Sequence, residues 1–393
     1  MYLIRDHEVN GKIHLKLSVL ICAIVIDSFV LNAQDARNCS YKSYKSNPIN
    51  QRAELLEDKG QLISIPIVVH VVYSNAQQNI SDEQITSQLK VLNEDFTRNN
   101  PDTINTLAVF KKNAGNAKIN FFLAVHDEFG NPTNGITRTP STHAPFANDD
   151  IHNKDKGGKN AWPTNNYLNV WICDLADGVF GFSSPIGSDP SIEGVVVDYL
   201  FFGTIGLVSA PFNKGRTATH EIGHWMGLKH LWGNAGGCTD DDGITDTPPQ
   251  IGPSSGCNLT RTSCGGLNMV QNFMDNSADE CMSLFSKGQI AEMRKNLFSF
   301  RSEIIQDGIV TSITDQSPSG MELIQIKSEI FLIKSEYPIE LIFVYNLFGQ
   351  EVSFLLDQSD KGKITLDLSG LGGFYILTAI SSNHRLTKKI LLQ

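Results

Sequence analysis

The distribution of apolar and polar residues predicts a mixed α/β region in the first and larger part of the chain. The run QLISIPIVVHVVYS at 61–74 is rich in β-branched residues, which is typical of a buried strand. The next segment, SDEQITSQLKVLNEDF at 81–96, has helical periodicity, and Ser81 with Gln84 can form a capping box at its start. Further apolar runs predict strands at 119–127, 168–175 and 193–202.

The pattern changes after this region. Between Leu231 and Met269 the chain is rich in Gly, Asp, Thr, Pro and Cys without a sustained period, which predicts an irregular segment. Helical periodicity resumes at 285–304, and the stretch DGIVTSITDQSPSG at 307–320 has the composition of a linker. Short alternating apolar segments then predict an all-β domain of about 75 residues.

The start of the chain has the features of a secretory signal. Basic residues precede the apolar run LSVLICAIVI at 17–26, which ends before Asp27. A membrane-spanning helix needs roughly 20 apolar residues, so a permanent span is not expected. A buried N-terminal helix is the alternative interpretation. Cys22 follows the bulky Ile21, which argues against a lipid anchor.

Composition excludes some classes of partner. The chain has 393 residues, of which 41% are apolar and 19% charged, as in soluble globular proteins of two or three domains. The formal net charge is −10 and there is no long Lys/Arg run, so binding to nucleic acid or to anionic lipid is not expected.

Most of the seven cysteines lie in the irregular segment or just after it. Cys238, Cys257, Cys264 and Cys281 cluster there. In an exported chain this clustering favours two disulfides that stabilise a poorly packed region. A structural zinc site is the alternative, although the spacing contains no CxxC pair.

The stretch THEIGHWMGLKH at 219–230 predicts a metal site. His220 and His224 lie four residues apart and so share one face of a helix. His230 is six residues further, about 600° around a continuing helix, and would point away from them. Gly227 can adopt the left-handed conformation that ends a helix and returns His230 to the other two.

Three imidazoles around an open fourth position indicate a catalytic zinc site, in which a bound water becomes acidic enough to attack near neutral pH. Glu221 is then the candidate general base, and later the acid for the leaving amine. The alternative is that the histidines only pack or cap a helix. That structural role is expected for His70, His126 and His143, and His70 is predicted to be a satisfied core residue.

The segment HEIGHWMGLKH resembles the zinc signature of the metzincin metallopeptidases. Its surroundings, GRTATHEIGHWMGLKH, GCTDDDGITDTP and QNFMDNSADECMSLFSKGQ in that order, resemble the pappalysin family from about Ile65 to Met293. The resemblance implies an α/β catalytic domain with a mixed twisted sheet, an active-site helix, an irregular lower part and a Met-turn at Met274. Relatives often carry tyrosine where this chain has Asn276, and asparagine does not reach as far.

The resemblance also implies cysteine pairing and a second ion. Pairing of Cys238 with Cys264 and of Cys257 with Cys281 is one of three connectivities that spacing alone leaves open. The family binds calcium near DDDGITDTP, which makes Asp242, Thr245 and Thr247 candidate ligands. A solvated acidic turn is the alternative.

Two further cysteines and one glutamate have expected roles. Cys39 stands where the family carries a latency cysteine, whose thiolate would occupy the fourth zinc position until proteolysis, after Arg52 or Lys59, removes the segment. Relatives usually have glycine after that cysteine, whereas this chain has serine, and an unpaired thiol without a role is the alternative. Cys173 is expected to be buried and inert. Glu292 is a candidate for binding a basic substrate side chain, or else a surface helix residue.

The C-terminal segments VYNLFGQEV, LDLSGL, GFYIL and KKILL resemble the type A sorting domain of the type IX secretion system, a β-sandwich of Bacteroidetes proteins. This implies export through the periplasm, with the secretion machinery as a partner, to the medium or the cell surface. A substrate-binding module is the alternative. The predicted division of the chain is a signal peptide at 1–34, a pro-segment at 35–60, a zinc metallopeptidase domain at 61–305, a linker at 306–317 and a sorting domain at 318–393.

Together these features predict a secreted zinc-dependent endopeptidase that is made as a latent zymogen and acts on proteins or peptides. A catalytically inactive binding or adhesion protein of the same fold is the alternative, but the intact Glu221 beside three histidines argues against it. A zinc hydrolase of non-peptide amides is a third hypothesis.

Overall fold

The computed structural model describes residues 39–41, 60–307, 321–327, 329–335, 338–346, 352–360, 363–381 and 384–392. The predicted signal peptide, the cleavage positions Arg52 and Lys59, and most of the predicted linker lie outside these residues. Within the described ranges, no helix is long and apolar enough to cross a membrane.

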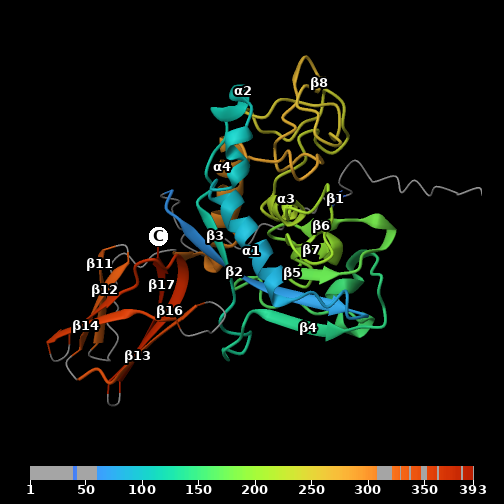
Figure 1. Cartoon of the computed structure of the whole chain (residues 1–393). Coiled ribbons are helices and arrows are strands. Elements are labelled where there is room, and N and C mark those ends of the chain that lie inside the picture. The colour runs from blue at the N-terminus through green and yellow to red at the C-terminus, as the bar shows by residue number, and fades with distance from the viewer. Residues whose placement is uncertain are drawn as a thin grey trace, which may run out of the picture. The chain divides into compact units, whose positions relative to one another are not determined.

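A mixed β-sheet is the framework of the first part of the chain (Figure 1). Its strands follow the order β1-β6-β7-β5-β2-β10, and β3 and β4 also pair with β2. The pairings of β2 with β3, β4 and β5, and of β5 with β7, are parallel, whereas β6 is antiparallel to β7. The bounds are β1 Cys39–Tyr41, β2 Ile63–Tyr73, β3 Ile119–Leu123, β4 Ile136–Pro140, β5 Leu168–Cys173, β6 Gly181–Ser184, β7 Gly194–Asp198 and β10 Gln306–Asp307.

Strand β2 is central because both of its faces are apolar. Ile65 and Ile67 belong to the main core, which the helices complete, whereas Val68 and Val72 belong to separate clusters that contain Trp162 and Trp171. This alternation is the strand period of two, and it confirms the prediction of a buried strand.

The strands predicted at 119–127, 168–175 and 193–202 are all shorter than their apolar runs. The run at 193–202 gives β7 only as far as Asp198, because the Asp198 side chain accepts a hydrogen bond from the backbone N–H of Leu200 (2.9 Å) and starts a short 3-10 helix. The run at 119–127 ends as a strand at Leu123. Gln306 and Asp307, which the sequence assigned to the linker, form β10 and pair with Ser64 and Ile63.

Helices α1 and α3 pack against the sheet and against each other. Ser81 accepts a hydrogen bond from the Gln84 backbone N–H (3.2 Å), so α1 begins where predicted. At the start of α4, Ser286 and Gln289 form a complete capping box. The helices are α1 Asp82–Phe96, α2 Ala108–Lys111, α3 Arg216–Trp225 and α4 Lys287–Phe300. Short 3-10 helices lie at Pro101–Asn105, Asn148–His152, Lys154–Lys156, Ala176–Gly178, Tyr199–Phe201 and Ser302–Ile304.

The segment between α3 and α4 is irregular, as its composition predicts (Figure 1). It contains a small hairpin formed by β8 (Thr262–Ser263) and β9 (Gly266–Leu267). Disulfides join Cys238 to Cys264 and Cys257 to Cys281, the pairing that the family resemblance implies. Cys173 is a buried free cysteine, and burial raises the pKa of its thiol well above the usual value.

The last part of the chain contains two antiparallel sheets, which confirms the all-β prediction. One has the order β11-β12-β15-β14 and the other the order β13-β16-β17, and residues of both form one apolar core. The bounds are β11 Met321–Lys327, β12 Ile330–Ser335, β13 Leu341–Asn346, β14 Leu355–Asp360, β15 Lys363–Asp367, β16 Gly373–Ser381 and β17 His384–Leu392.

Candidate metal centre

Helix α3 carries the first two histidines of the motif and is fixed at its start by buried charges. Arg216 pairs with Asp95 of α1 and with Asp102 (2.5 Å to Oδ2). Thr219, the residue before His220, donates a hydrogen bond to Asp95 Oδ2 (2.7 Å). These contacts tie the turn that bears His220 to α1.

The helix ends where the motif requires a bend. Gly227 has φ +92°, and its backbone N–H donates to the His224 carbonyl (2.8 Å). The Leu228 N–H returns to the Gly223 carbonyl (3.0 Å), which closes the turn. The predicted reversal at Gly227 is therefore present in the structure.

Each carbonyl at this helix end has a partner. The Trp225 carbonyl accepts from the Ile186 N–H (2.8 Å), and the Met226 carbonyl accepts from Asn296 Nδ2 of α4 (2.9 Å). A Cβ on Gly227 would lie 2.3 Å from that same Nδ2. The Asn296 amide therefore fills the space that the glycine leaves.

The bend brings three imidazoles together. The Nε2 atoms of His220, His224 and His230 lie 3.0 to 3.2 Å from one another. His220 Nδ1 contacts the Phe273 carbonyl (2.7 Å) and His224 Nδ1 contacts the Leu228 carbonyl (2.8 Å). Because a carbonyl only accepts, each Nδ1 carries the proton, and in the neutral ring Nε2 then presents a lone pair.

Convergent lone pairs repel one another unless a cation lies between them. Ligands about 2.0 to 2.1 Å from a tetrahedral ion are separated by roughly 3.3 Å, close to the spacing of these nitrogens. Among the described residues, these side chains are the only group of three or more His, Cys, Asp or Glu placed to share a metal ion. The donor set therefore fits zinc.

Burial favours the neutral rings that a metal requires. Desolvation lowers the pKa of His224 to about 4, against the opposing effect of its hydrogen bond to Leu228. Desolvation, and then the nearby His224, lower the pKa of His230 well below its usual value. Both imidazoles are therefore neutral at physiological pH, which is the ligating form.

The Glu221 side chain projects from α3 toward β6, and Met274 packs against α3 at Gly223. The Glu221 side chain is buried, and a Cβ on Gly181 of β6 would lie 3.2 Å from its Oε1. A Cβ on Gly223 would lie 2.4 Å from Met274 Sδ, so the thioether packs directly against the helix between its two histidines. Met274 therefore contacts α3 at the glycine between His220 and His224. Asn276 is buried, and its backbone N–H donates to Asp275 Oδ1 (2.7 Å).

The remaining candidates do not belong to the histidine cluster. Asp242 and Thr247 are buried and in contact, with Thr247 Oγ1 2.8 and 3.0 Å from the two carboxylate oxygens, whereas Thr245 is exposed. Glu292 lies on α4 and forms an ion pair with Lys295 (3.1 Å). Its carboxylate is only partly exposed and also accepts a hydrogen bond from Asn296 Nδ2 (3.4 Å).

The isolated histidines have structural positions. His70 is buried, with Nδ1 2.7 Å from Thr137 Oγ1 and Nε2 3.0 Å from Asn169 Oδ1, which confirms a satisfied core residue. His126 and His143 are exposed.

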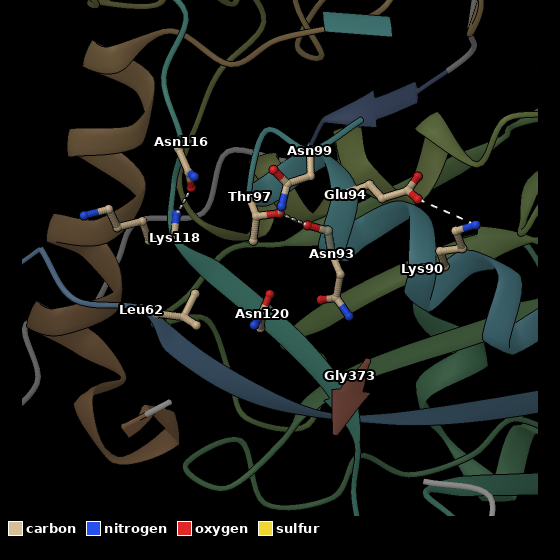
Figure 2. Close-up of a pocket in the computed structure, with 10 residues that line it drawn as sticks. All are labelled: Leu62, Lys90, Asn93, Glu94, Thr97, Asn99, Asn116, Lys118, Asn120 and Gly373. Carbon is tan, nitrogen blue, oxygen red and sulfur yellow. Dashed lines mark hydrogen bonds and ion pairs between the residues drawn. The ribbon is translucent and has the colours of Figure 1, made fainter. Parts of the chain in front are cut away.

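A polar hollow beside α1 is separate from the metal centre. Figure 2 shows Asn93, Glu94 and Asn120 among the residues that line it. None of the three clustered histidines, nor Glu221, lines this hollow.

Several groups at the centre have no signal in the sequence. Gly181, the Phe273 carbonyl and Asn296 come from segments far from the histidine motif. Trp232 lies two residues beyond His230, and its ring is parallel to the imidazole.

Comparison with known proteins decides the family. A sequence profile described as pregnancy-associated plasma protein-A, of the peptidase M43 group, matches residues 150–298. Extracellular metalloprotease 1 of Coccidioides posadasii is 31% identical over 307 residues, which cover 73% of this chain and 99% of that protein. The chain belongs to the pappalysin (M43) family. An extracellular metalloprotease of Arthroderma otae is 30% identical to this pappalysin. The match covers 61% of the pappalysin chain and 80% of the relative.

Solved structures agree with this membership. Mature mirolysin of Tannerella forsythia, in complex with a cleaved peptide, is 46% identical to the pappalysin with a TM-score of 0.60, over 62% of this chain and 96% of that one. A promirolysin mutant matches with the same identity and TM-score and covers 84% of its own chain. The pappalysin is a metalloendopeptidase with the metzincin fold, and its family implies a catalytic zinc and secretion.

Proposed function

We propose that this pappalysin is a secreted zinc endopeptidase in which His220, His224 and His230 hold the metal and Glu221 moves the proton. The observation that carries the proposal is the convergence of three Nε2 lone pairs at 3.0 to 3.2 Å. Carbonyls behind His220 and His224 fix their tautomers and so support the same assignment.

Zinc held there would acidify a water molecule and polarise the scissile carbonyl. Glu221 accepts a proton from the attacking water and delivers it to the leaving amine. Its burial beneath Gly181 fixes the carboxylate and keeps bulk water away from it. Substrate backbone can pair with the edge of β6, because this short strand lies beside Glu221 at the end of the sheet order, next to β1.

The test is digestion of a peptide library by protein that lacks the pro-segment, with and without a zinc chelator. Wild-type cleavage should stop with the chelator and return with zinc. Glu221→Gln should bind zinc normally but lose at least about a thousandfold in kcat, since both proton transfers fail. Glu128→Gln, which alters an exposed loop carboxylate, is the matched control. Chelator-insensitive cleavage, or an active Glu221→Gln, would refute the proposal.

We also propose that the protein is made as a latent zymogen. Strand β1 runs parallel to β6, with the Cys39 backbone opposite Gly181, the residue that faces Glu221. This register supports a form in which the Cys39 thiolate takes the fourth zinc position and β1 covers the β6 edge. One similar solved structure is named promirolysin, which accords with a latent form.

Latency predicts that Cys39→Ala makes the full chain active without proteolysis, because the thiolate ligand is lost. The change should be read as the initial rate on a fluorogenic peptide from a purified, uncleaved sample. Ser40→Ala leaves the thiol in place and should stay inactive. A Cys39→Ala chain as inactive as wild type would refute the thiolate mechanism.

A structural calcium ion near Asp242 completes the proposal. Thr247 Oγ1 lies 2.8 Å from the Ile244 carbonyl as well as close to both Asp242 oxygens. One hydroxyl proton cannot serve three acceptors, so this crowding of oxygens suits a hard cation, with Thr245 as a further ligand. Removal of calcium should lower the thermal midpoint of wild type but not of Asp242→Asn.

For export and specificity, we retain the sequence-based assignments as proposals. The β-sandwich at 318–393 directs type IX export. It follows a signal peptide at 1–34, a pro-segment at 35–60, the catalytic domain at 61–305 and a linker at 306–317. Glu292 binds a basic side chain of the substrate. Deletion of 318–393 should retain the protease in the periplasm of a Bacteroidetes host, and normal export would exclude the sorting role. Glu292→Gln should reduce cleavage before basic residues alone, and an unchanged preference would exclude the binding role.

A further inference from the structure

The third histidine of the cluster stacks on an aromatic ring. The rings of His230 and Trp232 are stacked, with centroids 4.4 Å apart and planes inclined by 11°. His220 and His224 contact backbone carbonyls through Nδ1. Both stacked rings are buried, with 7% of His230 and 9% of Trp232 exposed.

The stack restricts rotation of the His230 imidazole ring. Rotation of the His230 ring about its Cβ–Cγ bond would drive its edge into the indole plane. The indole itself belongs to the main apolar core and so cannot readily move aside. The His230 ring also meets the His224 ring, with centroids 4.5 Å apart and an interplanar angle of 84°. The imidazole therefore has one orientation in which Nε2 faces the other two nitrogens.

His230 needs this support because of its place in the chain. His220 and His224 lie on a regular helix whose hydrogen bonds fix their backbones. His230 follows the Gly227 bend, outside any helix or strand. A side chain on such a segment gains most from an external contact that limits its rotamers.

We propose that Trp232 is a positioning residue for the metal centre, one that orients His230 through the face of its indole. The inference rests on the proposed zinc site. It predicts that an aromatic face, rather than apolar volume, is what zinc affinity depends on. Trp232→Phe should keep wild-type affinity within about threefold, and Trp232→Leu should bind zinc about tenfold more weakly.

Trp162 offers a matched control. It is buried (6% exposed) and contacts a histidine outside the cluster, His70, edge-on at 6.0 Å. Trp162→Leu and Trp162→Phe therefore test loss of a buried indole beside an imidazole that does not face the metal. Both should lower the thermal midpoint and leave zinc affinity unchanged.

The experiment measures zinc affinity by competition with a chromophoric chelator, together with the thermal midpoint of the metal-free protein. The visible spectrum of the cobalt-loaded protein reports the ligand geometry. If Trp232→Leu does not fold, Trp232→Met replaces it, since methionine fills irregular space without an aromatic face.

The outcomes separate this inference from the proposed function. Weak zinc binding and an altered cobalt spectrum in Trp232→Leu, with Trp232→Phe like wild type, support the positioning role. Equal affinity in all Trp232 variants, or equal loss in Phe and Leu, overturns it. Failure of wild type to bind zinc would instead overturn the proposed function.

Discussion

Replacement of Gly227 by alanine tests how the bend in α3 assembles the metal centre. The backbone there has φ +92°, and a left-handed conformation costs alanine about 1–2 kcal/mol. The new Cβ would also lie 2.3 Å from Asn296 Nδ2, far inside contact distance. The amide must move, and the buried Met226 carbonyl then loses its hydrogen bond, at a cost of about 1–3 kcal/mol.

The two costs add to about 2–5 kcal/mol, which is large against a total stability of about 5–15 kcal/mol. Asn296→Ala alone loses the hydrogen bond to the Met226 carbonyl, at about 1–3 kcal/mol, and a long, partly exposed one to Glu292 (3.4 Å) that adds little. The double variant loses that bond once rather than twice, so its destabilisation should be smaller than the sum of the single variants by about 1–3 kcal/mol.

Urea denaturation of the metal-free proteins measures these free energies of unfolding, and chelator competition measures zinc affinity. Gly227→Ala should also bind zinc at least about tenfold more weakly, because His230 follows the bend. Lys295→Ala changes the neighbouring exposed residue of α4 and should behave as wild type. Additive single variants, or a Gly227→Ala variant destabilised by less than about 0.5 kcal/mol, would refute the reasoning.

Three further predictions concern other parts of the protein. Burial lowers the pKa of His70 to about 3, so its neutral ring stabilises the fold fully above pH 6.5. This stability is lost as the pH falls toward 3. The urea midpoint should therefore fall less between pH 6.5 and 4 in His70→Gln than in wild type. Asp95→Asn leaves Arg216 without its α1 carboxylate and should destabilise the protein by roughly 2–4 kcal/mol in thermal unfolding. The control Asp82→Asn should cost less than about 1 kcal/mol, because the ion pair of Asp82 with Arg138 is exposed. Asn276→Tyr should raise kcat on a peptide substrate without changing zinc affinity, if tyrosine there stabilises the transition state; an unchanged kcat would exclude that role.

The sequence predicts those elements whose signal is local. Strand β2 and helix α1 carry clear periodicity, and the bend at Gly227 follows from the spacing of three histidines of which only two can share one helix face. The pairing of the four clustered cysteines needed the family resemblance, because spacing leaves three connectivities open.

Other parts of the site depend on contacts between distant segments. Strand β6, GFSS, is too short to show an alternation, and its place beside Glu221 follows only from the sheet. In the sequence Asn296 is an ordinary polar helix residue, and its hydrogen bond to the Met226 carbonyl depends on how α4 packs against the bend. Nothing in the sequence distinguishes Trp232 from an ordinary core residue, and only the folded structure places its ring against His230.

The closed set of hydrogen bonds at the end of α3 has a consequence for metal exchange. The Trp225 and Met226 carbonyls and the Nδ1 of His224 are each engaged by protein groups rather than by the ion. Small zinc modules that unfold when stripped have no such independent support. Here the three histidines are preorganised, so the metal-free enzyme should stay folded. The rate at which it rebinds zinc should then be set by diffusion of the ion to the site rather than by refolding.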